Sequence, residues 1–293
     1  MEAVKILITG SSGFLGRATA ELFAKDSNYE IFRLGRQNPI QENYIYSNLA
    51  KESFTSLKNK ISINFDAIIH LAALTDFSKN FDAELFQINT IATSFLADIA
   101  SERRIRFIFA STATVVGSRK ICINSKLTMQ PDSNYALSKW LAEHYLIAKL
   151  KYPLILRFGG IFGFNGPSHL ALNKSITEIL TKRKIPTIYG LGKAKRNYIY
   201  VKDVARMIKF GLENNKKGIH FIAGTEILSI EQMVTKICDL YIPGSLPIRT
   251  GRRKIENQII EPSKDFPSTL NFEDALRDIQ SSYLQTNKLL VKK

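Results

Sequence analysis

Cysteine is scarce in this chain of 293 residues, which contains only Cys122 and Cys238. The two lie far apart and in no metal-ligand spacing, so we expect neither a disulfide framework nor a metal site. Long apolar runs are also missing, because no stretch approaches the roughly 20 residues that a membrane span requires. The N-terminus carries Glu2 and Lys5 and leads at once into an apolar strand, which leaves no room for a signal peptide. These absences predict a cytoplasmic protein with reduced thiols and no membrane span.

Acidic residues are few relative to basic ones: 26 Asp and Glu stand against 41 Lys and Arg, which gives a formal net charge of +15. Such a balance suits nucleic acid, an anionic membrane surface or phosphorylated small ligands. The basic residues form small clusters, at 103–104, 182–184, 193–196, 216–217 and 252–254, and none is interleaved with aromatic residues in a nucleic-acid module. Most of them are therefore expected on solvated surfaces, and nucleic acid is not an expected partner.

The pattern that is present is that of a large α/β protein. Apolar runs of strand length alternate with helical patterns over the first half of the chain. The predicted strands are 4–8, 30–34, 44–46, 65–73 and 105–110, and the predicted helices are 14–25, 51–58, 82–100 and 132–150. Strands that alternate with helices pair in parallel through right-handed crossovers, so the sequence predicts a doubly wound parallel sheet of the Rossmann type.

A glycine-rich turn follows the first predicted strand. Gly10, Gly13 and Gly16 recur at every third position, where missing side chains permit a tight turn, close approach of the backbone to a pyrophosphate and close helix packing. The helix over 14–25 would direct its free N–H groups at that pyrophosphate. The spacing differs from the G-x-G-x-x-G fingerprint, so a turn that needs glycine only for steric reasons is the alternative.

No carboxylate stands at the end of the second predicted strand. An acidic residue there binds the adenine ribose of NAD, whereas an arginine suits the 2′-phosphate of NADP. This chain has Gly35 and Arg36, and Arg36 can pair with a phosphate in a charge-assisted contact. NADP is therefore the favoured cofactor and NAD the alternative. The plainer interpretation of Arg36 is an exposed turn residue.

Tyr135 and Lys139 lie four apart in the predicted helix 132–150, and hence on one face. A phenol titrates near pH ~10 in isolation, and an ammonium one turn away is expected to lower that pKa toward useful acid/base work. Thr112, at the end of the neighbouring strand, can hydrogen-bond the same substrate oxygen. Together the three predict a proton-transfer site for a carbonyl or an alcohol; the Tyr and Lys alone would suit an ordinary helix surface.

Six segments of the chain occur in sheet order: Thr9-Gly10-Ser11-Ser12-Gly13-Phe14-Leu15-Gly16, His70-Leu71-Ala72-Ala73, Ser111-Thr112-Ala113-Thr114-Val115-Val116-Gly117, Tyr135-Ala136-Leu137-Ser138-Lys139, Arg157-Phe158-Gly159-Gly160-Ile161-Phe162-Gly163, and 196–205. With them the sequence resembles the extended short-chain dehydrogenase/reductase family, the nucleotide-sugar epimerase, dehydratase and reductase group. The resemblance covers nearly the whole chain. It implies an NAD(P)-dependent enzyme that transfers hydride between the nicotinamide and a sugar carbon.

The resemblance also assigns roles to residues. It implies that Tyr135 is the catalytic acid/base, that Lys139 lowers its pKa and binds the nicotinamide ribose, and that Thr112 orients the substrate oxygen. The implied cofactor-binding residues are Gly10, Ser12, Gly13, Phe14, Leu15, Gly16, Arg36, Leu71, Ala72, Ala73, Tyr135 and Lys139.

The predicted division of the chain follows the family. Residues 1–163 form the dinucleotide-binding Rossmann domain, to which 197–223 return, and residues 164–196 with 224–293 form a smaller C-terminal α/β lobe for the substrate. Arg196 is expected to pair with the diphosphate of a nucleotide-sugar, with a further contact from Arg252. Related proteins commonly form homodimers through two helices, which here are 82–100 and 134–150, and the sequence leaves the oligomeric state open.

Three reactions compete within the family. A 4,6-dehydratase carries an Asp-Glu pair after the catalytic Thr, and Ala113 and Thr114 stand there instead, which disfavours dehydration. A reductase exchanges NADPH for NADP at each turnover, whereas a 4-epimerase retains NAD. Arg36 places a ketoreductase slightly ahead of the epimerase. The hypothesis from another class is a non-catalytic dinucleotide sensor or RNA-binding protein, which the positive charge favours and the intact Tyr and Lys disfavour.

Overall fold

The computed structural model describes residues 2–36, 42–76 and 80–291. The chain folds into two compact units. The first, here called the Rossmann unit, comprises Met1–Ser118, Ser125–Phe158 and Val204–Phe221, and the second comprises Arg119–Asn124, Gly159–Asp203 and Ile222–Lys293. These bounds differ from the predicted division, which assigned 159–163 and 197–203 to the first part. That the second unit binds the substrate stays a prediction.

The seven strands of the main sheet are β1 (Val4–Thr9), β2 (Tyr29–Gly35), β3 (Tyr44–Tyr46), β4 (Ala67–His70), β5 (Arg106–Thr112), β7 (Leu154–Phe158) and β12 (Gly218–Ile222). They lie in the order β12-β7-β5-β4-β1-β2-β3. The pairs from β7 to β3 are parallel, as in the register of Ile6 with Ala67 and of Ile68 with Phe107. The order reverses between β1 and β4, where ligands bind in doubly wound sheets. The predicted fold class is confirmed.

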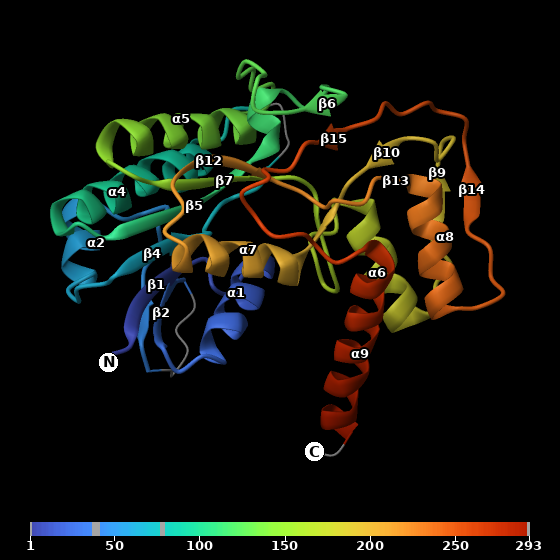
Figure 1. The fold of residues 1–293 in the computed structure, drawn as a ribbon, viewed down its shortest axis with the longest axis horizontal. Helices are drawn as coiled ribbons and strands as arrows, with labels where there is room; N and C mark the ends of the chain where they lie inside the picture. The colour runs from blue at the N-terminus through green and yellow to red at the C-terminus, as the bar shows by residue number, and fades with distance from the viewer. Residues whose placement is uncertain (1, 37–41, 77–79, 292–293) are drawn as a thin grey trace. The chain divides into compact units, whose positions relative to one another are not determined.

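Helices cover both faces of this sheet (Figure 1). On one face lie α2 (Phe54–Lys60), α4 (Ala92–Arg103) and α5 (Asn134–Lys149), and on the other lie α1 (Phe14–Ala24) and α7 (Val201–Glu213). All residues of β4 and β7 are buried, as expected for central parallel strands. The main core packs strand residues such as Leu7 and Phe107 against Leu57, Leu96 and Leu146 of α2, α4 and α5.

The predicted helix over 82–100 is interrupted. A short helix α3 (Ala83–Phe86) is followed by a π-helix over Gln87–Ile91, and α4 begins only at Ala92. A single π-helical turn inside an α-helix is often found at a functional site. Asn89, inside this π-helix, is fully buried.

The second unit contains α6 (Ala171–Lys182), α8 (Ile230–Tyr241) and α9 (Phe272–Val291). Its short strands pair as β6 (Cys122–Ile123) with β15 (Ile259–Ile260), β8 (Ile161–Phe162) with β11 (Ile199–Tyr200), β9 (Thr187–Tyr189) with β14 (Ile248–Thr250), and β10 (Lys195–Arg196) with β13 (Leu228–Ser229). Helix α9 extends to Val291, and Asn271 accepts the N–H of Asp274 at its start.

Within residues 2–36, 42–76 and 80–291, none of the helices combines the length and apolar composition needed to cross a bilayer. The same part of the chain contains no group of His, Cys, Asp and Glu side chains arranged to hold a metal ion. Both cysteines are free thiols, Cys122 exposed and Cys238 buried.

Candidate active site

The glycine-rich turn lies at the carboxyl end of β1 and leads into α1, as predicted. Helix α1 begins after Gly13, where no side chain caps it and no acidic residue occurs in its first turn. Because the first N–H groups of a helix have no intrahelical acceptor, an uncapped start favours an anion. Ser12 and Gly13 are exposed beside it, and Phe14 and Leu15 are half-buried.

Two of the three glycines also have a steric reason. Gly10 has a φ of +69°, and a Cβ there would lie 2.6 Å from the backbone nitrogen of Ala72. A Cβ on Gly16 would overlap the carbonyl oxygen of Gly10. The steric interpretation therefore accounts for Gly10 and Gly16, so the argument for a pyrophosphate depends on the uncapped start of α1 and not on the glycine spacing.

The segment after β4 packs against the end of β1. The N–H of Ala72 donates to Thr9 Oγ1 at 3.2 Å, and Thr9 Oγ1 also bonds His70 Nδ1 at 2.6 Å. His70 Nε2 bonds Thr93 Oγ1 at 2.8 Å. Burial lowers the pKa of His70 to about 3, so this neutral imidazole is a structural link, as expected, while Leu71, Ala72 and Ala73 line the switch between β1 and β4.

Gly35 ends β2 against an aromatic hydroxyl. A Cβ at Gly35 would lie 2.8 Å from Tyr44 Oη, so a carboxylate side chain does not fit at this position unless Tyr44 moves. Arg36 follows with an exposed side chain. The end of the strand therefore presents a cation and no carboxylate.

Thr112 is the last residue of β5 and is 8% exposed. Its Oγ1 accepts the N–H of Thr114 at 3.2 Å and bonds the Thr114 hydroxyl at 2.9 Å. Thr112 therefore starts the 3-10 helix Ala113–Val116. A hydroxyl held in this way has a fixed position at the carboxyl edge of the sheet.

Tyr135 and Lys139 lie one turn apart in α5, which Ser133 caps by accepting the N–H of Ala136 at 3.2 Å. Tyr135 is half-buried, whereas Lys139 is 1% exposed. The Lys139 Nζ lies 4.1 Å above the centre of the Phe109 ring. An ammonium above an aromatic face gains a cation–π contact, which offsets part of its lost hydration.

The pKa values of this pair follow burial. Burial raises the pKa of Tyr135 to about 12, and it lowers the pKa of Lys139 to about 7, against an opposing effect of the Glu143 carboxylate. The predicted lowering of the Tyr135 pKa is therefore wrong for this structure. The reason is desolvation, which disfavours both the phenolate and the ammonium and which the spacing in the sequence does not reveal.

A buried ion pair next to Lys139 was not predicted. Glu143 lies one turn after Lys139, and its carboxylate accepts Arg157 Nε at 3.0 Å and a terminal Arg157 nitrogen at 2.6 Å. The Ser111 hydroxyl donates to the same carboxylate. The pair ties α5 to β5 and β7. The signal was present, since Glu143 repeats the four-residue spacing of Tyr135 and Lys139 and Arg157 interrupts an apolar strand.

Asn89 of the π-helix was also missed. Its amide donates to the Leu74 carbonyl at 2.9 Å and to Ser138 Oγ at 3.0 Å, while its oxygen accepts the Leu74 N–H at 2.9 Å. Ser138 directly precedes Lys139 in α5. Asn89 therefore fixes the segment after β4 to the helix that carries the Tyr and Lys. Its position, four residues after Leu85 and three before Ala92, matches the buried face of the helix, but the spacing alone does not indicate its partners.

Of the residues predicted to bind substrate, Thr112 lies in the Rossmann unit, whereas Arg196 and Arg252 lie in the second unit. Arg196 donates from one terminal nitrogen to the carbonyls of Lys195 and Glu256, both at 2.8 Å, so its guanidinium is held in place. Arg252 is exposed. A buried neighbour, Asn197, was missed: its amide donates to Gly224 and Ile260 carbonyls at 2.8 and 2.7 Å, which fastens three segments of this unit.

The Rossmann unit thus suits a dinucleotide. The uncapped start of α1 fits a diphosphate, Arg36 fits a further phosphate, and a fixed hydroxyl and a Tyr-Lys pair follow β5 at the same carboxyl edge of the sheet. These features define a dinucleotide-binding α/β protein. The chain belongs to the NAD dependent epimerase/dehydratase family, whose model matches residues 6–224.

The relatives have several activities. The chain is 28% identical over 271 residues to a dTDP-D-glucose 4,6-dehydratase of Dictyostelium discoideum, covering 81% of this chain and 62% of that protein. It is 25% identical to an uncharacterised UDP-glucose epimerase of Bacillus subtilis, covering 81% and 82% of the two chains. The solved structure of UDP-N-acetylglucosamine 4-epimerase from Bacillus cereus has a TM-score of 0.83 and 26% identity, over 96% of this chain and 99% of that one.

Proposed function

We propose that this protein is an NADP-dependent oxidoreductase that reduces a keto group of a nucleotide-linked sugar. Membership of the family supports nicotinamide-dependent chemistry on such a substrate. The end of β2 carries the cofactor preference, because it has glycine in place of a carboxylate at position 35 and an exposed guanidinium at Arg36. Without that carboxylate, a 2′-phosphate meets no repulsion and gains a cationic partner.

NADPH supplies the hydride when bound, with its diphosphate at Gly10, Ser12, Gly13 and the start of α1. The chain's own residues manage the proton. As hydride adds to the carbonyl carbon, Tyr135 Oη gives its proton to the carbonyl oxygen, and Thr112 Oγ1 holds that oxygen in place. Lys139, buried one turn from Tyr135, provides positive charge beside the phenolate that forms.

The titration of Tyr135 supports the reductive direction. Its pKa of about 12 keeps the phenol protonated at neutral pH, which is the state that donates a proton to a carbonyl oxygen. The oxidative half of an epimerase cycle starts instead by removing a proton from a sugar hydroxyl, and a phenol that is protonated at neutral pH does not accept that proton.

A 4-epimerase with retained NAD is the second candidate, and the epimerase names among the relatives favour it. Dehydration has less support although a dehydratase is among them. Ala113 and Thr114 follow Thr112, and Thr114 is hydrogen-bonded to it, so no carboxylate pair stands at the positions where the elimination would require one.

On the substrate side, we propose that Arg196 pairs with the diphosphate of the sugar nucleotide and that Arg252 adds a contact. Because two carbonyls hold the Arg196 guanidinium, little side-chain freedom is lost on binding. A homodimer through α4 and α5 also stays a prediction; Leu141 and Ile147 expose apolar surface on α5, at 38% and 51%.

Cofactor content and preference test this proposal. Purified protein is denatured with acid to identify any bound nucleotide, and the nucleotide-free protein is then titrated with NADPH and NADH. We expect NADPH to bind more tightly, and Arg36→Ala to weaken NADPH about tenfold to a hundredfold, the value of one charge-assisted contact, without changing NADH. Lys25→Ala, which removes an exposed cation elsewhere in this unit, is the matched control and should change neither.

Tightly retained NAD, together with an unchanged affinity in Arg36→Ala, would refute the NADP assignment and make the epimerase the leading candidate. If neither dinucleotide binds and the protein instead binds RNA with a steep salt dependence, the non-catalytic alternative gains.

A further inference from the structure

A cavity lies at the end of the main sheet that is opposite to the candidate active site. It has a volume of about 550 Å³ and is lined entirely by residues of the Rossmann unit. Asp66 precedes β4, Arg106 begins β5 and Pro153 precedes β7, so the cavity lies at the amino ends of these strands. The glycine-rich turn and Thr112 follow the carboxyl ends. The cavity is therefore separate from the candidate active site.

Cations dominate its lining. Arg104, Arg106, Lys149, Lys151 and Lys217 come from three segments of the chain, and Asp66 is the one carboxylate among the lining residues. The Asp66 carboxylate accepts the backbone N–H of Lys5 at 2.7 Å.

Most of this positive charge is uncompensated. Lys149 forms an ion pair with Asp98 at 3.0 Å. In the described part of the chain, no carboxylate lies within ion-pair distance of Arg104, Arg106, Lys151 or Lys217. Lysines and arginines on a protein surface commonly pair with carboxylates. Four cationic side chains without such a partner around one cavity therefore indicate affinity for an anion.

Arg106 is the most constrained of these cations. Its two terminal nitrogens donate to the carbonyls of Tyr152 and Lys216, and its Nε is buried without a hydrogen-bond partner. Desolvation lowers its pKa, and none of its described partners is a carboxylate. An anion bound beside it would stabilise that charge.

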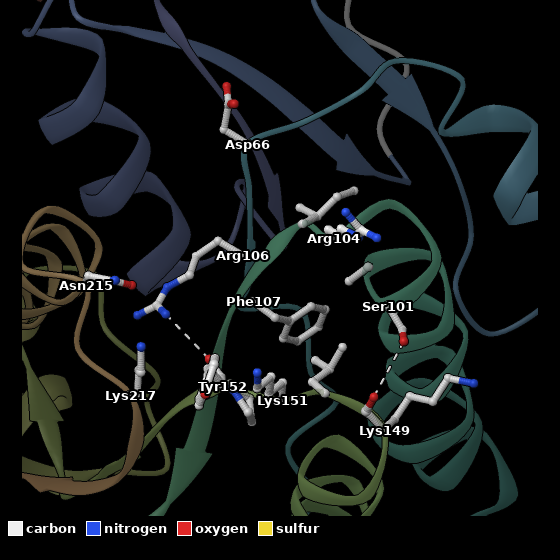
Figure 2. A pocket seen from close by; sticks show the side chains of 14 residues that line it. Asp66, Ser101, Arg104, Arg106, Phe107, Lys149, Lys151, Tyr152, Asn215 and Lys217 are labelled. Carbon is white, nitrogen blue, oxygen red and sulfur yellow. Dashed lines mark hydrogen bonds between the residues drawn. The ribbon is translucent and has the colours of Figure 1, made fainter.

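Lys217 adds a second charge at the same place. Figure 2 shows its ammonium pointing toward the Arg106 guanidinium, and its Nζ lies 4.1 Å from the centre of the Tyr152 ring. Lys151 lies over the same ring at 5.1 Å. Both ammonium groups contact the Tyr152 ring. A multivalent anion near Lys217 and Arg106 would offset the repulsion between these two like charges.

We propose that this cavity binds a small anion with a diphosphate group, at Arg106, Lys151 and Lys217. The volume is that of a small-molecule site. Cations from separate segments suit an anion with several charged oxygens, and a guanidinium pairs with phosphate through two N–H donors. Inorganic pyrophosphate and a nucleoside diphosphate share this chemistry. Asp66, which also lines the cavity, already accepts the backbone N–H of Lys5.

Calorimetric titration with sodium pyrophosphate, at two salt concentrations, tests the site. The variant Lys151→Gln/Lys217→Gln removes two exposed ammonium groups whose described contacts are to a ring, so its fold should be kept. Lys25→Gln/Lys51→Gln makes the same charge change on exposed residues of the same unit outside the cavity. We expect one pyrophosphate per wild-type and control chain, with equal affinity, and at least tenfold weaker binding in the cavity variant. Arg106→Gln should weaken it similarly.

Titration with ADP then separates the two sources of the group. Tighter binding of ADP than of pyrophosphate, lost in the cavity variant, identifies a nucleoside diphosphate, and equal binding identifies the diphosphate alone. The proposal is overturned if wild type binds no pyrophosphate, or if all three proteins bind it equally. It is also overturned if wild type binds a nucleic-acid duplex that pyrophosphate cannot displace and the cavity variant binds that duplex more weakly. The cationic surface would then bind a polymer and not a small anion.

Discussion

The buried pair of Glu143 and Arg157 makes a sharp prediction about stability. Both side chains are almost fully buried, at 1% and 7% exposed, and the carboxylate also accepts the Ser111 hydroxyl. Glu143→Gln keeps the volume and one acceptor oxygen but leaves the guanidinium without a countercharge. Breaking a buried pair from one side costs about 3–5 kcal/mol. Because the amide oxygen still accepts a hydrogen bond, we expect a loss of about 3 kcal/mol.

Urea unfolding measures this loss. The only tryptophan, Trp140, lies in α5 close to Glu143 in sequence, so its fluorescence reports on this region. With an m-value of about 3 kcal/mol/M, the midpoint should fall by about 1 M. Glu102→Gln is the matched control, because Glu102 pairs with Lys58 at 2.6 Å on the surface, where an ion pair contributes about 0–1 kcal/mol.

A second variant separates the pair from the packing. Replacing both partners, as Glu143→Leu/Arg157→Met, removes the stranded charge, so the double variant should be less destabilised than Glu143→Gln. The reasoning fails if Glu143→Gln loses no more than Glu102→Gln, or if the double variant is as unstable as the sum of the two single ones.

Two predictions concern Tyr135 and Lys139. Tyr135→Phe should lower kcat on the reducible sugar nucleotide about 10²- to 10⁴-fold with little change in NADPH affinity, because it removes the proton donor alone; retained activity with unchanged affinity would exclude Tyr135 as the acid. Lys139, with a pKa of about 7 when folded and an ordinary value of 10.5, keeps its proton longer in the unfolded chain. The free energy of unfolding should therefore rise with pH through this interval, by about 2 kcal/mol from pH 7 to 9 relative to Lys139→Met. Parallel urea titrations of the two proteins across that range measure the difference, and a flat difference would show that Lys139 is not desolvated.

The fold could be predicted wherever an element is long enough to show a period. The predicted strands at 4–8 and 44–46 and the helix at 14–25 coincide closely with β1, β3 and α1. Strands of two residues, such as Ile161–Phe162, display no alternation and were missed. The helix over 82–100 was predicted without its π-helix, since one extra residue in a turn leaves the apolar spacing nearly intact.

The candidate site was predicted only in part. The spacing of Tyr135 and Lys139 and the residues after β1 and β4 identified an edge of the sheet, because parallel strands bring their carboxyl ends together. Asn89 and Glu143 were missed, since their importance lies in partners that are 15 and 49 residues away for Asn89 and 14 and 32 away for Glu143.

By itself the sequence determined the alternation of strands and helices, the glycine-rich entry to α1, the missing carboxylate at Gly35 and the pairing of Tyr135 with Lys139. These depend on local periodicity and residue type. The tertiary structure decided how those groups are charged, because burial follows from packing between distant segments. It also decided that Arg106 and Lys217 meet at a cavity, since charges more than 100 residues apart become neighbours only when strands and loops assemble.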